Sequence, residues 1–229
     1  MVRIATLRAK SLALREKSTL PFGVNCLEVV AAEAQELDTA LASWSRDVPE
    51  DWKFSTQPSP ASLGPPETDL RYNGPVHTYT THGHAAIWNR YRAVRLIVNS
   101  IRIRALSDLL QNQSQHSFVV PQQDLCQKNM DSIVEDLCGS VPFFFNSPNT
   151  NGDGTGLRSI RLGNFVISTE SEILPKMAGL LAWPLTLAVS TDGVPEPQRQ
   201  WLKRKLKIVA TSIGDAILES VAEQGEFRF

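Results

Sequence analysis

Apolar residues recur along this chain at alternating steps of three and four positions, the spacing that places them on one face of an α-helix. The clearest example follows Asn25, which with Glu28 three residues later is typical of a helix N-cap. Its apolar stripe consists of Val30, Ala34, Leu37, Leu41, Trp44 and Val48. We find no convincing alternation of strands and helices, so the pattern predicts an α-helical protein.

The same pattern predicts five further helices, over about residues 4–18, 84–111, 121–141, 175–190 and 197–225. Pro121 suits the first turn of its helix, Pro184 kinks or breaks the most apolar one, and Gly225 ends the last one. We therefore expect an all-α fold, an irregular multi-helix bundle of about six helices with long Pro/Gly-rich loops. A single domain over residues 1–229 is the simplest arrangement of these helices.

Two segments fall outside the helical pattern. Residues 55–81 contain five prolines and two glycines with few apolar residues between them, which predicts a long loop. Residues 142–172 are irregular, and their weakly apolar part from Ile160 to Ile167 leaves both a loop and a short hairpin open.

The composition narrows the class of protein. The 23 basic and 24 acidic residues give a formal net charge of −1, whereas a dedicated nucleic-acid binder usually has a large basic excess, so we expect no direct nucleic-acid binding. The scattered residues Cys26, Cys126 and Cys138 are expected to be reduced core residues of an intracellular protein, nuclear or cytoplasmic. We recognise no secretory signal and no apolar run of roughly 20 residues, so no membrane association is expected.

Charge is segregated between two of the predicted helices. Residues 84–107 include five arginines and no acidic residue, whereas residues 28–51 include seven acidic residues and only one basic residue, Arg46. Because a guanidinium group binds a carboxylate through two hydrogen bonds, this pattern favours internal pairing of the two helices. The alternative is that Arg92 and Arg95, three residues apart on one face, bind an anionic or carbonyl-bearing ligand in a pocket.

Three histidines, His77, His82 and His84, lie close together before the arginine-rich helix. We predict no metal site, because the segment offers no Asp, Glu or Cys to complete a ligand set. Imidazole titrates near neutral pH, so these histidines, together with Arg95, are the candidate catalytic residues if the protein is an enzyme. No phosphate-binding loop, nucleophile elbow or metalloprotease motif is recognisable, and we expect no cofactor.

Four segments, in this order, resemble the fungal-specific transcription factor domain, the regulatory region of fungal binuclear zinc-cluster transcription factors. They are the acidic helix ending in Val48-Pro49-x-x-Trp52, the stretch Trp88-Asn-Arg-Tyr-Arg92-Ala-Val-Arg95, the helix end Cys138-Gly-Ser-Val-Pro142-Phe, and Trp183-Pro184 followed by Pro197-x-Arg-x-Trp201. The resemblance covers about residues 28–223. The family's six-cysteine zinc cluster, basic linker and coiled coil have no counterpart, so the chain is similar to the C-terminal half of the regulatory domain.

The resemblance implies a helical scaffold that senses a ligand or contacts other proteins, without catalysis and without its own DNA-binding module. The alternative is a stand-alone protein of fungal secondary metabolism, a cofactor-independent cyclase or isomerase acting on a small molecule between helices. A structural subunit with a broad exposed apolar patch is a third hypothesis. Expected partners are a small-molecule ligand, another regulatory protein or a second copy of the chain. The candidate ligand-binding residues are Trp88, Tyr91, Arg92, Arg95 and Trp183.

Overall fold

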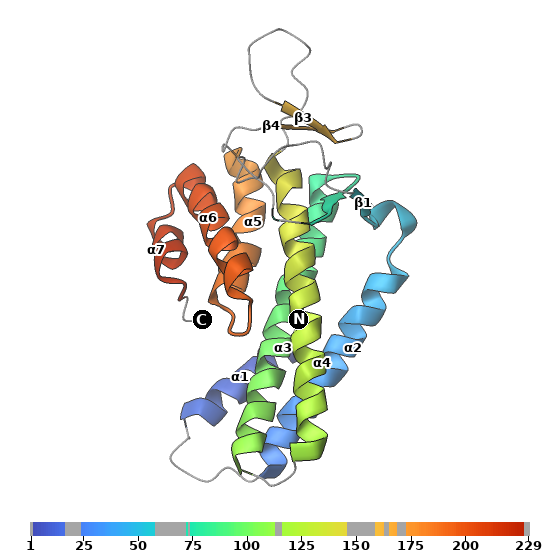
Figure 1. Ribbon diagram of the computed structural model, residues 1–229, viewed down its shortest axis with the longest axis vertical. Coiled ribbons are helices and arrows are strands. Elements are labelled where there is room, and N and C mark those ends of the chain that lie inside the picture. The colour runs from blue at the N-terminus through green and yellow to red at the C-terminus, as the bar shows by residue number, and fades with distance from the viewer. Residues whose placement is uncertain are drawn as a thin grey trace. The chain divides into compact units, whose positions relative to one another are not determined.

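The computed structural model describes residues 2–16, 24–57, 72, 74–112, 116–145, 159–162, 165–168 and 173–226 (Figure 1). Within these residues the chain forms seven α-helices, two 3-10 helices and two pairs of short strands. The predicted all-α fold class is therefore confirmed. None of the described helices combines the length and the apolar character that crossing a bilayer requires.

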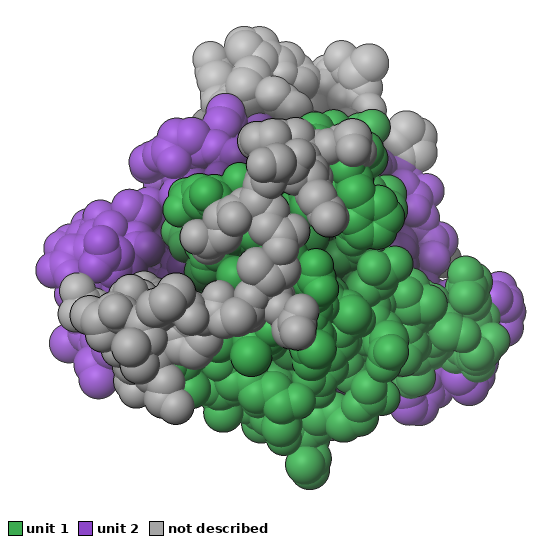
Figure 2. All heavy atoms as spheres, turned by 90° about the horizontal axis from the view of Figure 1, so that it is seen from below, with its two compact units in different colours: residues 1–48, 94–133, 191–193 green, residues 49–93, 134–190, 194–229 purple. Residues whose placement is uncertain are grey.

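The chain divides into two compact units, coloured separately in Figure 2. Unit 1 consists of residues 1–48, 94–133 and 191–193, and unit 2 of residues 49–93, 134–190 and 194–229. Helices α3 (His82–Asn112) and α4 (His116–Ser140) each contribute residues to both units. A division into compact units does not decide whether the chain folds as one domain or two, so the single domain predicted from the sequence stays a prediction.

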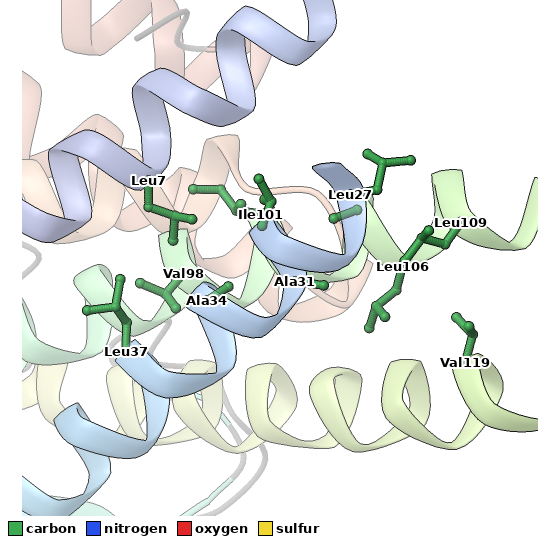
Figure 3. Close-up of a cluster of buried hydrophobic side chains, with 12 residues drawn as sticks. Leu7, Leu27, Ala31, Ala34, Leu37, Val98, Ile101, Leu106, Leu109 and Val119 are labelled. Atoms are coloured by element: carbon green, nitrogen blue, oxygen red, sulfur yellow. The ribbon is translucent and has the colours of Figure 1, made fainter. Parts of the chain in front are cut away.

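Unit 1 contains α1 (Val2–Glu16), α2 (Val24–Asp47) and parts of α3 and α4. Of the predicted stripe, Val30, Ala34 and Leu37 are buried in the core, and Figure 3 shows Ala34 and Leu37 in this cluster. Leu41 is partly buried against it, whereas Trp44 is 39% exposed and Val48 follows the end of α2, so the stripe holds only over the first part of the prediction. Each large apolar side chain buried in this way contributes about 1.5–3 kcal/mol to folding. The other buried members of this cluster are Leu7, Leu27, Ala31, Val98, Ile101, Ala105, Leu106, Leu109 and Val119.

Unit 2 contains α5 (Pro175–Ser190), α6 (Glu196–Ile213) and α7 (Ala216–Gln224), with α6 packed against both of the others (Figure 1). The 3-10 helices η1 (Glu50–Trp52) and η2 (Val141–Phe145) also belong to it. As predicted, α5 is the most apolar helix, and Pro184 lies inside it without ending it. The core of this unit includes Phe144, Leu181, Leu185, Leu202 and Leu206.

Both short strand pairs are antiparallel and belong to unit 2. Strand β1 (Ser55–Gln57) pairs with β2 (Val76–Thr78), so the two ends of the predicted 55–81 loop are hydrogen-bonded to each other. Strand β3 (Ser159–Leu162) pairs with β4 (Phe165–Ser168), which confirms the hairpin alternative for the weakly apolar part of 142–172. The remainder of the predicted loop, residues 58–71 and 73, lies outside the described residues, as do residues 146–158, 163–164 and 169–172.

The predicted last helix is two helices. Gly214 adopts the left-handed conformation, with φ of 71°, and ends α6, while the Asp215 side chain accepts hydrogen bonds from the first turn of α7. Glycine tolerates positive φ and aspartate is a strong N-cap, so Gly214 ends α6 and Asp215 begins α7. The described part of the chain therefore contains seven α-helices, one more than predicted.

Two predicted helix starts were wrong. Helix α4 begins at His116, so Pro121 lies inside the helix and not in its first turn. Helix α2 already includes Val24, so Asn25 is a helical residue and not the N-cap. Local start signals are weak against tertiary packing, which extends a helix wherever its apolar face finds a partner.

Candidate functional site

A buried cluster of polar and aromatic side chains lies in unit 2, centred on Arg92 in the family-like stretch from Trp88 to Arg95. We call it the Arg92 cluster. Arg92 is 1% exposed, and it donates hydrogen bonds to the hydroxyl oxygen of Tyr79 at 2.7 Å and to Oδ1 of Asn89 at 2.9 Å. The guanidinium carbon lies 5.0 Å from the centre of the Phe54 ring and 5.7 Å from that of Trp88. The aromatic rings thus surround the charge, an arrangement that stabilises a desolvated cation.

His77 is the third acceptor for Arg92. Its Nδ1 lies 3.2 Å from an Arg92 nitrogen, and because a guanidinium group can only donate, this Nδ1 must be unprotonated. The proton of the neutral ring is then on Nε2, which lies 3.6 Å from Oδ1 of Asp136. Phe54 stacks on the imidazole, with ring centres 4.3 Å apart. These contacts fix both the tautomer and the orientation of the ring.

Helix α4 closes the cluster at Gly139 and Ser140. The Ser140 hydroxyl lies 2.7 Å from Oδ1 of Asn89 and 2.7 Å from the carbonyl oxygen of Leu137, and its single proton is donated to one of these two oxygens at a time. A Cβ atom at Gly139 would lie 2.7 Å from the carbonyl oxygen of Pro75 and 3.2 Å from Nε2 of His77. Position 139 therefore requires glycine, because Pro75 and His77 pack closely against the helix at this point.

The His77 imidazole makes folding sensitive to acid. Burial, followed by the nearby Arg92 guanidinium, lowers the pKa of His77 from 6.5 to about 3. As the pH falls from 6.5 toward 3, the unfolded chain takes up a proton that the folded protein does not, so stability is lost. This residue alone should cost about 2 kcal/mol between pH 7 and pH 5, and urea unfolding at both pH values measures the loss. The variant His77→Gln should recover that loss, whereas an equal loss in variant and wild type would contradict the assignment.

Arg95 belongs to unit 1, where it pairs with the acidic helix as the charge pattern predicted. Its Nε and one terminal nitrogen donate to the two carboxylate oxygens of Asp38, at 2.7 and 2.8 Å. Asn99 donates to the same carboxylate at 2.7 Å, and its Oδ1 lies 3.1 Å from Sγ of Cys126. Asp38 is 6% exposed, so this is a buried ion pair with every carboxylate oxygen in use.

Arg102, also in unit 1, is bound in a different way. It is 3% exposed and one terminal nitrogen donates to the side-chain oxygens of Gln35 and Gln122, at 2.9 and 3.1 Å. Arg104 faces Asp192 at 3.5 Å, and Arg90 is exposed. The arginines of α3 thus differ in burial, and the three buried deepest all have partners within the chain.

His82 and His84 lie at the start of α3, away from the hydrogen bonds of Arg92. The Thr81 hydroxyl accepts a hydrogen bond from the backbone N–H of His84 at 3.1 Å and so caps the helix. The His84 ring stacks on Trp52 at 5.0 Å, and the His82 ring lies 4.8 Å from that of Phe143. Nε2 of His82 and Nδ1 of His84 are buried and find no hydrogen-bond partner among the residues that the structure describes, and burial lowers the pKa of His82.

The structure brings together only part of the predicted ligand-binding set. Trp88, Tyr91 and Arg92 are neighbours in unit 2, with the Trp88 and Tyr91 rings 5.4 Å apart. Trp183, in α5, is 37% exposed and makes none of the hydrogen bonds or ring contacts of this cluster among the described residues. Arg95 is bound to Asp38 in unit 1. Whether any of these residues binds a ligand stays a prediction.

The cysteines partly match the prediction. Cys126 and Cys138 are buried, and burial raises the pKa of the Cys126 thiol to about 11 and that of Cys138 further, which keeps both unreactive. Cys26 is exposed, so its assignment to the core was wrong. Among the residues that the structure describes, no group of three His, Cys, Asp or Glu side chains is placed to hold a metal ion.

Sequence reasoning missed the residues that complete the Arg92 cluster. Phe54, Tyr79 and Asp136 were not candidate site residues, and Asn89 was named only as part of the stretch that resembles the family, without a role of its own. Asn89 and Arg92 are three residues apart on one helix, a spacing that brings side chains together and could have suggested their contact. Phe54 and Tyr79 lie on either side of a long polar segment, and only the β1–β2 pairing explains their proximity.

Comparison with known proteins returned no match: no family model, no curated protein and no solved structure is significantly similar to this chain.

Proposed function

We propose that the chain is a regulatory helical domain of the kind found in fungal zinc-cluster transcription factors, without a DNA-binding module of its own. It senses a small molecule or contacts another regulatory protein, and it does not catalyse a reaction. The observation that carries the proposal is that Arg92 and Arg95, in the stretch that resembles the family, are both bound by internal partners.

The internal binding of these arginines supports a scaffold and weighs against catalysis. A catalytic guanidinium must meet charge that develops on a substrate, but both oxygens of Asp38 already occupy Arg95. A general acid or base works best with a pKa near the operating pH, and the pKa of His77 is far below it. Two of the candidate catalytic residues therefore have structural roles.

A reporter assay tests the regulatory function. The whole chain is fused to a heterologous DNA-binding domain, and transcription is measured from a promoter that carries the matching operator. We expect transcription to rise or fall severalfold relative to the DNA-binding domain alone. The matched control is Leu202→Asp, which places a charge at a position that is 0% exposed in unit 2 and should abolish the effect. An expressed, folded wild-type fusion that leaves transcription unchanged would contradict the proposal.

The second candidate function is catalysis on a small molecule, as a cofactor-independent cyclase or isomerase. One observation favours it: Nε2 of His82 and Nδ1 of His84 are buried and have no hydrogen-bond partner within the described residues. The double variant His82→Asn, His84→Asn separates the two functions. If the domain acts by regulation alone, the reporter signal should be unchanged in this variant. If the signal depends on a reaction product, it should disappear, while an unchanged circular dichroism spectrum shows that the variant is still folded.

A further inference from the structure

The Arg92 cluster contains a buried positive charge that none of the carboxylates in the described part of the chain meets directly. All three hydrogen-bond acceptors of the guanidinium group are neutral, namely the Tyr79 hydroxyl, the Asn89 amide oxygen and Nδ1 of His77. The carboxylate of Asp136 lies 3.6 Å from Nε2 of His77, the ring nitrogen that does not contact Arg92, and the Asp136 side chain is 47% exposed. By contrast, the Arg95 guanidinium in unit 1 has a carboxylate on two of its nitrogens. A desolvated charge of this kind is stabilised by a counter-ion at hydrogen-bond distance.

The same cluster has more donors than acceptors. Nε of Arg92 and Nδ2 of Asn89 are both buried and have no hydrogen-bond partner among the described residues, and the two residues are 1% and 0% exposed. The Asn89 oxygen accepts from the Arg92 guanidinium, which can only donate, and this contact fixes the amide orientation and leaves the NH₂ group as the unsatisfied end. Buried donors in native proteins nearly always have an acceptor. Two unsatisfied donors three residues apart, beside a charge that has no carboxylate partner among the described residues, therefore indicate an acceptor outside the part of the chain that the structure describes.

We propose that the Arg92 cluster binds a small monovalent anion of about halide size, held by Nε–H of Arg92 and the amide N–H groups of Asn89. The anion supplies both missing features, the negative charge and the lone pairs. The site goes beyond the proposed regulatory function, because it concerns what completes this core and not what the domain contacts. Since His77 and Tyr79 bind the same guanidinium, the anion also stabilises strand β2 and the adjacent residue Tyr79.

Bromide is the probe for this site, because it scatters anomalously and is chemically close to chloride. In crystals of the whole chain soaked in sodium bromide, we expect an anomalous peak at hydrogen-bond distance from Arg92 Nε and Asn89 Nδ2. In solution, bromide at ten times its Kd should raise Tm by roughly 3 °C relative to gluconate at the same ionic strength.

Two variants separate site binding from general salt effects. Asn89→Asp places a carboxylate beside the guanidinium in the same shape, so it should abolish the bromide-dependent rise in Tm. Arg90→Gln removes an exposed cation that follows Asn89 directly in the sequence, and it should leave the rise unchanged. A water molecule in place of bromide in the cluster would overturn the proposal, and so would a Tm that responds to bromide equally in wild type and Asn89→Asp. If Asn89→Asp does not fold, the crystal result decides alone.

Discussion

Replacing Asp38 with asparagine should lower the free energy of unfolding by about 3 kcal/mol, because it leaves the Arg95 guanidinium partly buried without a counter-charge. The Asp38 side chain is 9% exposed and that of Arg95 is 15% exposed, so water can compensate only a small part of the loss. Asparagine keeps the shape and can still accept from Asn99, which isolates the charge as the quantity that changes. Urea unfolding at neutral pH measures the difference.

Asp47→Asn is the matched control for this prediction. Asp47 lies on the same helix and is exposed, so its substitution should change stability by no more than about 0.5 kcal/mol. If Asp38→Asn were as stable as the control, the Asp38–Arg95 pair would not hold unit 1 together, and Arg95 would again be a candidate for ligand binding.

Replacing Trp88 with alanine should lower the free energy of unfolding by about 3–5 kcal/mol, the usual cost of removing a large aromatic side chain from a core. Trp88 is 7% exposed, and its ring makes edge contacts with Phe54 and Tyr91. Its indole N–H donates to the carbonyl oxygen of Trp52 at 2.7 Å, which ties the 3-10 helix η1 to α3 within unit 2. The effect should therefore exceed that of a simple loss of apolar area.

Trp88→Phe separates the two contributions. It keeps a ring in the core but leaves the Trp52 carbonyl without its donor, so we expect a loss of about 1–2 kcal/mol. A Trp88→Ala variant that unfolds at the wild-type urea concentration would show that the ring does not support the core, and would favour the predicted ligand-binding role.

The sequence predicted those features of the fold that repeat. The apolar stripe of α2, the continuous apolar character of α5 and the acidic–basic segregation between α2 and α3 each correspond to a packed face or an ion pair in the structure. Such patterns are reliable because burial of apolar surface dominates folding and acts at every turn of a helix.

Single-residue signals were less reliable. Pro121 and Asn25 suggested helix starts that tertiary packing overrode, and Gly214 followed by Asp215 was passed over although it ends one helix and begins the next. The Arg92 cluster could not be assembled from the sequence, because Phe54 and Arg92 are 38 positions apart and their contact depends on the pairing of two three-residue strands. Pairings over such distances have no local signature.

Arg92, Arg95 and Arg102 of α3 are internal linkages of the fold, and the exchange of their side-chain protons with solvent measures how firmly each is held. In a protein labelled with ¹⁵N-arginine, the Nε–H proton of Arg95 and the terminal guanidinium protons of Arg92 and Arg102 should exchange with solvent at least about tenfold more slowly than the corresponding protons of the exposed Arg90. Equal exchange rates for all four arginines would contradict the account.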